Sequence, residues 1–153
     1  TFLTFKLPRG WSCALDETEQ VCRLASDSDK SREAIIILAM KERGDSDTLD
    51  IYLDHLRKPQ RPGGSAPTSE PSEVRHVGTR RIGTHTWIES VHLGSEVPNF
   101  VTHYYAGLMS RVAVLVTFSA HKDYYSNYVA DIDAMIDSLV IYQSAMQHRS
   151  AAM

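Results

Sequence analysis

The sequence predicts an α+β domain, in which two main helices flank a central antiparallel sheet of about six to eight strands as an α/β/α sandwich. Two observations carry this prediction. Short apolar segments recur along the chain between turns that contain glycine or proline, as is typical of strands. Only residues 44–58 and 123–140 space their apolar side chains with the period of a helix. A chain of 153 residues suits one core, so we expect a single domain over residues 1–142.

Composition restricts the classes of function. The net charge of −3 provides no basic surface for nucleic acid. No segment approaches the roughly 18 consecutive apolar residues that span a membrane. We therefore expect neither a nucleic-acid partner nor a membrane span in the chain. It starts at Thr1 rather than Met, which is consistent with a mature product whose N-terminal signal or anchor has been removed.

The first part of the chain is rich in strand patterns. Residues 1–7 alternate apolar and polar side chains and predict a half-buried strand. Residues 11–15 and 20–24 predict two strands of a hairpin that turns at residues 16–19. Residues 32–41 are apolar on both faces and rich in β-branched side chains, which predicts a central strand.

The first predicted helix has apolar residues at positions i, i+3, i+4 and i+7, namely Leu49, Tyr52, Leu53 and Leu56. Ser46 or Asp47 is the expected N-cap. Lys58–Ser72 then contain four prolines, two glycines and almost no apolar side chains. Such a segment buries too little surface to offset the entropy of ordering, so we expect a mobile loop within the domain.

Four more strands are predicted after the loop, and their short connections make them an antiparallel meander. Their ranges are 74–82, 85–93, 100–106 and 111–120. The last of them is apolar on both faces and is expected near the centre of the sheet. The second helix follows, and residues 143–153 are expected to form a disordered tail.

Both cysteines lie in the predicted hairpin. If the turn closes around residues 16–19, Cys13 lies opposite Cys22, where Cβ atoms are about 4.5–5.5 Å apart. A small adjustment reaches the distance of a disulfide. Two buried free thiols are one alternative, and a metal site is another, although no histidine lies in the hairpin. The register favours the disulfide, which predicts an oxidising compartment.

The richest group of polar side chains lies on two neighbouring predicted strands. His85 and Glu89 share a face of the first with Trp87, which we expect in the core. His103 and Tyr105 share a face of the second. If the strands pair, His85, Glu89, His103 and Tyr105 could bind a divalent metal such as Zn²⁺, or a small ligand. The alternative is a set of cross-strand polar and aromatic pairs on a half-exposed sheet.

Common catalytic motifs are missing from the sequence. There is no G-x-S-x-G, no H-E-x-x-H and no glycine-rich dinucleotide motif. The glycines at 63 and 64 lie in a proline-rich loop, where they build no phosphate-binding turn. We therefore expect no enzymatic activity, with a hydrolase of an unrecognised type as the opposing hypothesis.

Two short motifs point to a known family. "LPRGW" at residues 7–11 follows the first strand, and "YVADIDAMIDSL" at residues 128–139 fits the pattern Y-x-x-D-I-x-x-M-I-x-S-L. With the order of elements, they resemble the PsbP/Mog-type superfamily, most closely its bacterial DcrB-like exported members. The resemblance covers roughly residues 2–142 and implies an α/β/α sandwich around an antiparallel sheet.

The resemblance also implies a class of function. Members act mostly as accessory or scaffolding proteins; PsbP proteins support the oxygen-evolving complex and can bind metal ions, and Mog-type proteins bind Ran. It implies a non-enzymatic accessory domain with a protein partner, in a bacterial protein exported to the periplasm. The alternative is a metal or small-ligand carrier that uses the histidine cluster. Lys58–Ser72 and a sheet edge are the expected contact surfaces.

Overall fold

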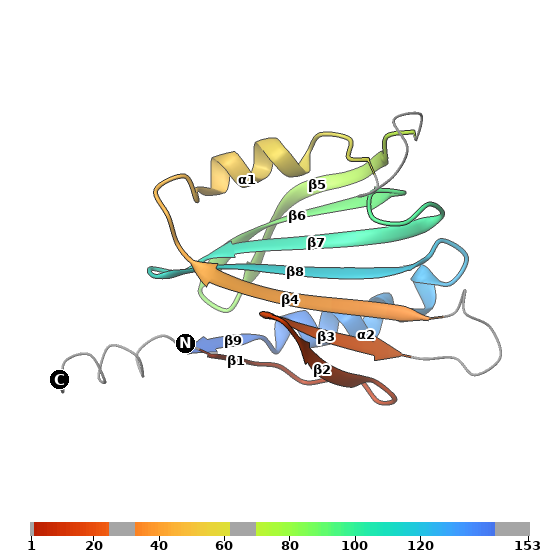
Figure 1. Cartoon of the computed structure of the whole chain (residues 1–153), viewed down its shortest axis with the longest axis horizontal. Helices are drawn as coiled ribbons and strands as arrows, with labels where there is room; N and C mark the ends of the chain where they lie inside the picture. Colours follow the sequence, from red (N-terminus) through yellow and green to blue (C-terminus); the bar gives the residue numbers. More distant parts are fainter. Residues whose placement is uncertain (1, 25–32, 62–69, 143–153) are drawn as a thin grey trace.

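The computed structural model describes residues 2–24, 33–61 and 70–142. Its main element is an antiparallel sheet of seven strands (Figure 1). In spatial order the strands are β2 (Ser12–Asp16), β3 (Glu19–Leu24), β4 (Ala34–Glu42), β8 (Val112–His121), β7 (Phe100–Leu108), β6 (His85–Leu93) and β5 (Glu73–Ile82). The predicted fold class, the meander β5–β8 and the interior positions of β4 and β8 are confirmed.

Two helices lie on opposite faces of this sheet (Figure 1). Helix α1 (Leu49–Leu56) packs on β5, β6 and β7, where it contacts Ile88, Tyr104 and Ala106. Helix α2 (Tyr125–Asp137) buries Ile132, Met135 and Ile136 against the other face. Alternate residues of a strand point to opposite faces, so β6 and β7 supply both layers.

A second, two-stranded sheet was not predicted. β1 (Phe2–Thr4) pairs with β9 (Val140–Tyr142), which directly follows α2, so the predicted second helix ends earlier than residue 140. Leu3, Phe5 and Ile141 pack against the same core as α2. The α2 face of the main sheet is therefore covered by a helix and a ribbon, whereas in the described part of the chain the other face has α1 alone.

The start of α1 corrects the predicted cap. Thr48, rather than Ser46 or Asp47, is the N-cap, and its side chain accepts a hydrogen bond from the Ile51 amide at 3.2 Å. Asp47 is instead buried, and its Oδ2 accepts from the Gly44 amide at 2.7 Å. The aspartate therefore closes the turn before the helix rather than the helix itself.

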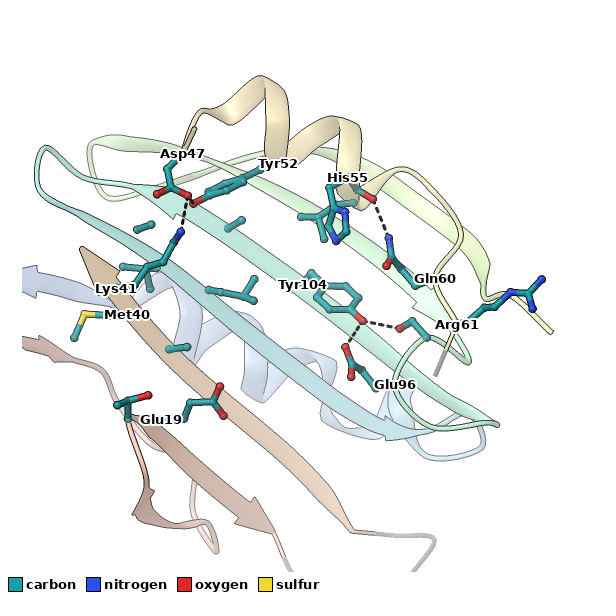
Figure 2. Close-up of a pocket in the computed structure, with 18 residues that line it drawn as sticks. Glu19, Met40, Lys41, Asp47, Tyr52, His55, Gln60, Arg61, Glu96 and Tyr104 are labelled. Atoms are coloured by element: carbon teal, nitrogen blue, oxygen red, sulfur yellow. Dashed lines mark hydrogen bonds and ion pairs between the residues drawn. The ribbon is translucent and has the colours of Figure 1, made fainter. Parts of the chain in front are cut away.

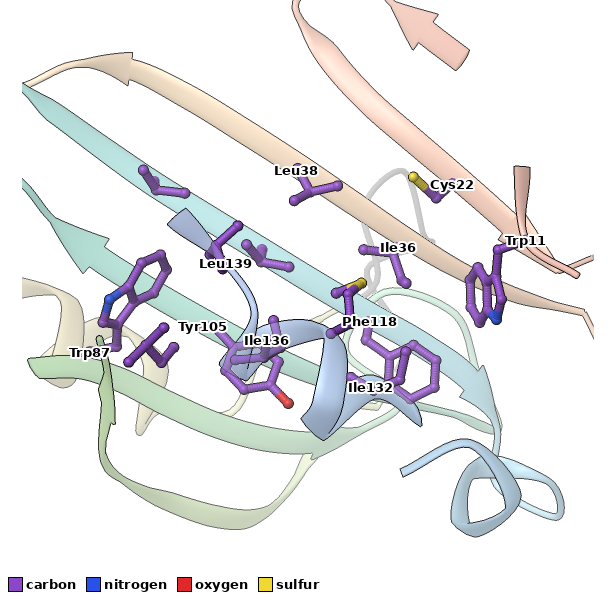
Figure 3. Packing of buried hydrophobic residues seen from close by; sticks show 14 of the residues in the cluster. Trp11, Cys22, Ile36, Leu38, Trp87, Tyr105, Phe118, Ile132, Ile136 and Leu139 are labelled. Atoms are coloured by element: carbon purple, nitrogen blue, oxygen red, sulfur yellow. The ribbon is translucent and has the colours of Figure 1, made fainter. Parts of the chain in front are cut away.

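The larger core lies between the sheet and α2 (Figure 3). Ile36 of β4, Tyr105 of β7 and Phe118 of β8 point toward α2 and are almost completely buried. A fully buried side chain of this size contributes about 1.5–3 kcal/mol relative to an exposed one. Trp87 is 1% exposed, so its predicted place in the core is confirmed.

The indole of Trp87 lies directly on the backbone of Gly107 in the neighbouring strand. A Cβ atom added to Gly107 would lie under 3.0 Å from three ring atoms of Trp87. The glycine is therefore required here by close approach rather than by a turn, because the buried ring has no room to retreat.

The hairpin β2–β3 has the predicted register, with Cys13 opposite Cys22, Ala14 opposite Val21 and Leu15 opposite Gln20. The structure joins the two cysteines in a disulfide. Cys22 is fully buried, whereas all five residues of β2 are exposed. The bond therefore attaches an exposed edge strand to the core.

Two predicted segments lie partly or wholly outside the described residues. These are the tail at 143–153 and most of the loop, residues 62–69. The ends of the loop are described: the Ser72 amide donates to the Gln60 carbonyl at 2.6 Å, and the Gln60 amide donates to Ser72 Oγ at 2.7 Å. The base of the loop is thus closed by a reciprocal pair of hydrogen bonds.

We predict that Gly107→Ala lowers the free energy of unfolding by about 1–3 kcal/mol, the usual effect of overpacking a filled core. Gly44→Ala is the matched control, since its added Cβ would meet Asp47 at an ordinary 3.5 Å. Urea denaturation followed by tryptophan fluorescence measures both. Equal losses in the two variants would contradict the contact with Trp87.

We predict that a Cys13→Ser, Cys22→Ser double variant loses about 2.5–3 kcal/mol, because the bond closes a short loop with a sequence separation of 9. Urea denaturation of the variant, and of the native chain with and without reductant, measures the loss. Reductant should change the native chain and leave the variant unchanged. A shared midpoint in all samples would show that the bond does not form.

Candidate functional site

An open cavity of about 630 Å³ lies between α1 and the sheet (Figure 2). We call it the α1 groove. Its floor includes Ala39 of β4, Ala113 and Leu115 of β8 and Ala106 of β7; its wall is formed by Tyr52, His55 and Leu56 of α1. Cavities of this size are typical of small-molecule sites, and this one is lined mainly by apolar surface.

The groove is open because α1 covers only one side of its face of the sheet. The helix packs on β5, β6 and β7, and β8 and β4 extend beyond it. Leu115 is consequently 40% exposed, and Ile35 and Ile37 on the same face of β4 are only half-buried. Apolar side chains in the middle of a sheet are usually covered, so this strip is a surface that another molecule can cover.

One end of the groove is built around Asp47. Its carboxylate accepts hydrogen bonds from the Tyr52 hydroxyl at 2.7 Å and the Gly44 amide at 2.7 Å, and pairs with Lys41 at 2.9 Å. The Gly44 amide, the Tyr52 hydroxyl and Lys41 together lower the pKa of Asp47 to about 2. Burial and the bond to Asp47 raise the pKa of Tyr52 to about 12. Both groups therefore hold one protonation state at neutral pH.

The other end is built around Tyr104, which stands on β7 beneath the groove (Figure 2). Its hydroxyl donates to Glu96 Oε1 at 2.7 Å and accepts from Ser95 Oγ at 2.7 Å. Burial and Glu96 raise the pKa of this phenol. Neutral Tyr104 thus connects the floor of the groove to the segment between β6 and β7.

His92 of β6 fixes α1 to the sheet. Its ring is fully buried, and its Nε2–H donates to the Leu56 carbonyl, at the end of α1, at 2.7 Å. Nδ1 then accepts from Ser72 Oγ at 2.8 Å, and that hydroxyl in turn accepts from the Gln60 amide. Burial lowers the pKa of His92. A neutral imidazole thus holds the helix end and the base of the loop together.

A second polar group, the Glu89 cluster, lies on the α2 face. Glu89 Oε2 accepts from His103 Nε2–H at 2.9 Å, and Glu89 Oε1 lies 3.3 Å from His76 Nε2. The hydroxyls of Tyr105 and Tyr125 lie 3.0 and 3.1 Å from His103 Nδ1. Burial lowers the pKa of His103 and raises the pKa of Tyr125 to about 12. His103 and Tyr125 are therefore mainly neutral at pH 7, and both ring nitrogens of His103 have hydrogen-bond partners.

Arg80 of β5 closes this cluster from the side of α2. It binds Asp133 and Asp137 at 3.0 Å each, lies 4.0 Å from Glu89 Oε2, and stands over the Tyr105 ring at 5.9 Å. These two ion pairs join α2 to the edge of the sheet.

The structure brings together three of the four residues predicted as a metal or ligand site, namely Glu89, His103 and Tyr105. His85 is separate, because it lies four residues from Glu89 along β6, roughly 13 Å at strand spacing, and is exposed. His76, rather than His85, is the second histidine that lies beside Glu89. Within residues 2–24, 33–61 and 70–142, no group of three or more His, Cys, Asp or Glu is placed to hold a metal ion. A metal or ligand role for the cluster stays a prediction.

Sequence reasoning missed the α1 groove. Its residues come from six separate stretches between Thr18 and Leu115, and none forms a local motif. A signal was present in residues 35–39, which are apolar on both faces although the chain has few helical segments to cover two faces. Nothing in the sequence distinguishes His92 from the other six histidines.

The fold is shared with several solved structures. LpqN, involved in cell envelope biogenesis of Mycobacterium tuberculosis, superposes with a TM-score of 0.70 at 9% identity, over 92% of this chain and 83% of that one. The solution structure of cyanobacterial PsbP (CyanoP) from Synechocystis sp. PCC 6803 superposes with a TM-score of 0.57 at 11% identity, over 92% of this chain and 86% of that one. The Ran-binding protein Mog1p of Saccharomyces cerevisiae superposes with a TM-score of 0.57 at 12% identity, over 94% of this chain and 92% of that one.

The chain therefore has the PsbP/Mog1p-like fold that the sequence motifs implied. At these identities the likeness concerns the fold alone. No model of a known protein family and no curated protein sequence matches the chain. Among the described helices, none combines the length and the apolar character needed to cross a bilayer.

We predict that the chain loses stability as the pH falls from 7.5 to 5.5. The folded pKa of His92 lies below its ordinary 6.5, so the unfolded chain binds more protons in that window and the neutral form is favoured by folding. The contribution is complete above pH 6.5 and is lost as the pH falls toward the folded pKa. Melting temperatures across this range measure it.

His92→Gln, which keeps a donor for the Leu56 carbonyl, should reduce this pH dependence, with His103 accounting for part of the remainder. The exposed His85→Gln is the control and should leave the dependence unchanged. An unchanged dependence in His92→Gln would contradict the role of the buried imidazole.

Proposed function

We propose that this chain is a non-enzymatic binding domain of an exported bacterial protein, akin to the DcrB-like proteins, and that the α1 groove is its binding surface. The observation that carries the proposal is the incomplete cover of the α1 face. Leu115 is 40% exposed and lines a cavity of about 630 Å³ in the middle of the sheet, where such a side chain is normally buried.

The polar groups around the groove favour binding over catalysis. Asp47 is saturated by the Gly44 amide, Tyr52 and Lys41. Ser72 and His92 form a hydroxyl–imidazole pair, yet both are buried and His92 Nε2 is bound to a main-chain carbonyl rather than to an orienting carboxylate. These groups support the shape of the groove, and none of them forms an activated nucleophile among the residues that the structure describes.

An extracytoplasmic location is supported by two independent features. The disulfide between Cys13 and Cys22 is stable in oxidising compartments. The fold is also that of LpqN, which is involved in cell envelope biogenesis, and of CyanoP. A protein partner, as for the Ran-binding protein Mog1p, is one kind of occupant that the groove can accept.

Site-specific photo-crosslinking tests the proposal. A photoreactive phenylalanine analogue at Leu115, inside the groove, is compared with the same analogue at Ile51, which is 50% exposed on α1 and does not line the cavity. Irradiation of cells that make the protein, followed by mass spectrometry, identifies the adducts. The groove position should capture a discrete molecule, and position 51 should not.

The same adducts from both positions would show contact unrelated to the groove. No adduct at position 115 would also overturn the proposal. In each case, a melting temperature within the range of the native chain establishes that the substituted proteins are folded.

A further inference from the structure

The face of the sheet that carries α1 has a mainly apolar strip on β4 and β8, beside the helix. We call it the β4–β8 strip, and its residues are Ile35, Ile37, Ala39, Leu115 and Thr117. Ala39 lies opposite Leu115, which in turn lies opposite Ala106 beneath α1, so the strip and the helix share one face. Leu115 is 40% exposed and the other four side chains are half-buried.

The strip has the width and length of one short helix. Helices that pack side by side lie about 8–10 Å apart, and neighbouring strands lie about 4.8 Å apart. Because α1 packs on β5, β6 and β7, a second helix at that distance from α1 lies two strands beyond β6, over β8 and β4 (Figure 1). Ile35 to Ala39 span roughly 13 Å, the length of about nine helical residues. α1 itself has eight.

The chemistry of the strip favours a helix over an extended segment. A strand laid across apolar side chains would direct its amides and carbonyls at groups that accept and donate no hydrogen bonds, and burying unpaired backbone groups is costly. A helix pairs these groups within itself and presents side chains alone. α1 already packs in this way on the other half of the same face, where it contacts Ile88, Tyr104 and Ala106.

One end of the strip has an acidic margin. Glu19 of β3 lies opposite Ala39 and lines the α1 groove (Figure 2). Asp16 of β2 lies directly opposite Glu19 on the same face, and both side chains are exposed. Like charges that face each other across two strands repel, so a cation placed between them is favoured. Lys41 and Asp47 beyond this end form an ion pair at 2.9 Å and add no net charge.

The other end of the strip has a basic margin. Arg23 of β3 is exposed and lies opposite Ile35. The side of the strip that borders the β2–β3 hairpin therefore changes from acidic to basic along the strand. A molecule that complements this side carries a cation near Glu19 and an anion near Arg23, roughly 13 Å apart.

We propose that the β4–β8 strip binds an amphipathic helix of a partner protein, which lies beside α1. This rests on the proposed function, because Ala39 and Leu115 of the strip line the α1 groove. The partner helix places apolar residues spaced i, i+3, i+4 and i+7 on the strip, a lysine or arginine at Glu19, and an acidic residue at Arg23. The α1 helix of a second copy does not meet this description, since its apolar residues pack on its own sheet.

Peptide selection on the purified chain tests the inference. The probe is a phage-displayed library of helix-constrained random peptides of about 15 residues, a length that forms few stable helices without a constraint. The native chain should enrich peptides with the stated apolar spacing and charges, and the Leu115→Asp chain should not. A parallel library of disulfide-cyclised, non-helical peptides should give no binder that Leu115→Asp abolishes.

Variants test the apolar contact with one enriched peptide, synthesised and measured by fluorescence anisotropy. Leu115→Asp should weaken binding at least about tenfold, since the buried leucine is lost from the interface. Ala39→Arg, which fills the floor of the strip, should do the same. Val140→Asp is the matched control, because Val140 is 45% exposed on β9, and it should leave the affinity unchanged. Melting temperatures show whether each variant is folded.

A charge variant tests the acidic margin. The double change Asp16→Asn, Glu19→Gln should weaken the same peptide about two- to fivefold, as expected for exposed ion pairs, and should reduce the dependence of binding on salt. Asp131→Asn, at an exposed position of α2 on the opposite face, is the control and should change neither quantity.

Four results would overturn the inference. These are no helical binder, helical binders that tolerate both Leu115→Asp and Ala39→Arg, groove binders confined to the non-helical library, and an affinity that the charge variant leaves unchanged. If no helix binds but position 115 crosslinks to a discrete lipid or small molecule in cells, the proposed binding function stands and the occupant is wrong. If position 115 captures nothing and no helix binds, both proposals fail.

Discussion

The structure depends on a mismatch between the width of its sheet and the helices available to cover it. Seven strands about 4.8 Å apart span roughly 29 Å, whereas a helix with its side chains is about 10–12 Å wide. On one face, α2 is supplemented by the β1–β9 ribbon, so the core there is closed. On the other, eight-residue α1 is the one covering element within residues 2–24, 33–61 and 70–142, and it packs on β5, β6 and β7 rather than on β8 and β4. The groove follows from this deficit.

An incomplete layer needs a means of holding its one helix in place. α1 buries few residues of its own, so packing alone fixes it weakly. His92 compensates by binding the last carbonyl of the helix from within the sheet, and Asp47 does so at the opposite end through Tyr52. A buried and a partly buried hydrogen bond thus hold α1 at its two ends, in addition to its apolar contacts.

Most of the fold could be predicted from apolar patterns in the sequence. The hairpin register, the central β4 and β8 and both helices could be predicted because each depends on local periodicity. β9 could not, since three residues after a helix have no period of their own and pair only once β1 is in place. Of the predicted site, Glu89 and His103 met because neighbouring strands bring them opposite or diagonal, whereas His85 lies too far along the same strand. The groove is formed by segments that are far apart in the sequence, so the spacing of residues in the sequence could not predict it.

The disulfide has a consequence for association between molecules. β2 is the outermost strand, fully exposed and only five residues long, and few side chains hold it against the rest of the chain. If it separated, β3 would become the edge and present unpaired amides beside buried Val21 and Cys22, a template for strand exchange or fibrous aggregation. The Cys13–Cys22 bond keeps the short strand in register, so the covalent link protects the sheet from other copies of the chain.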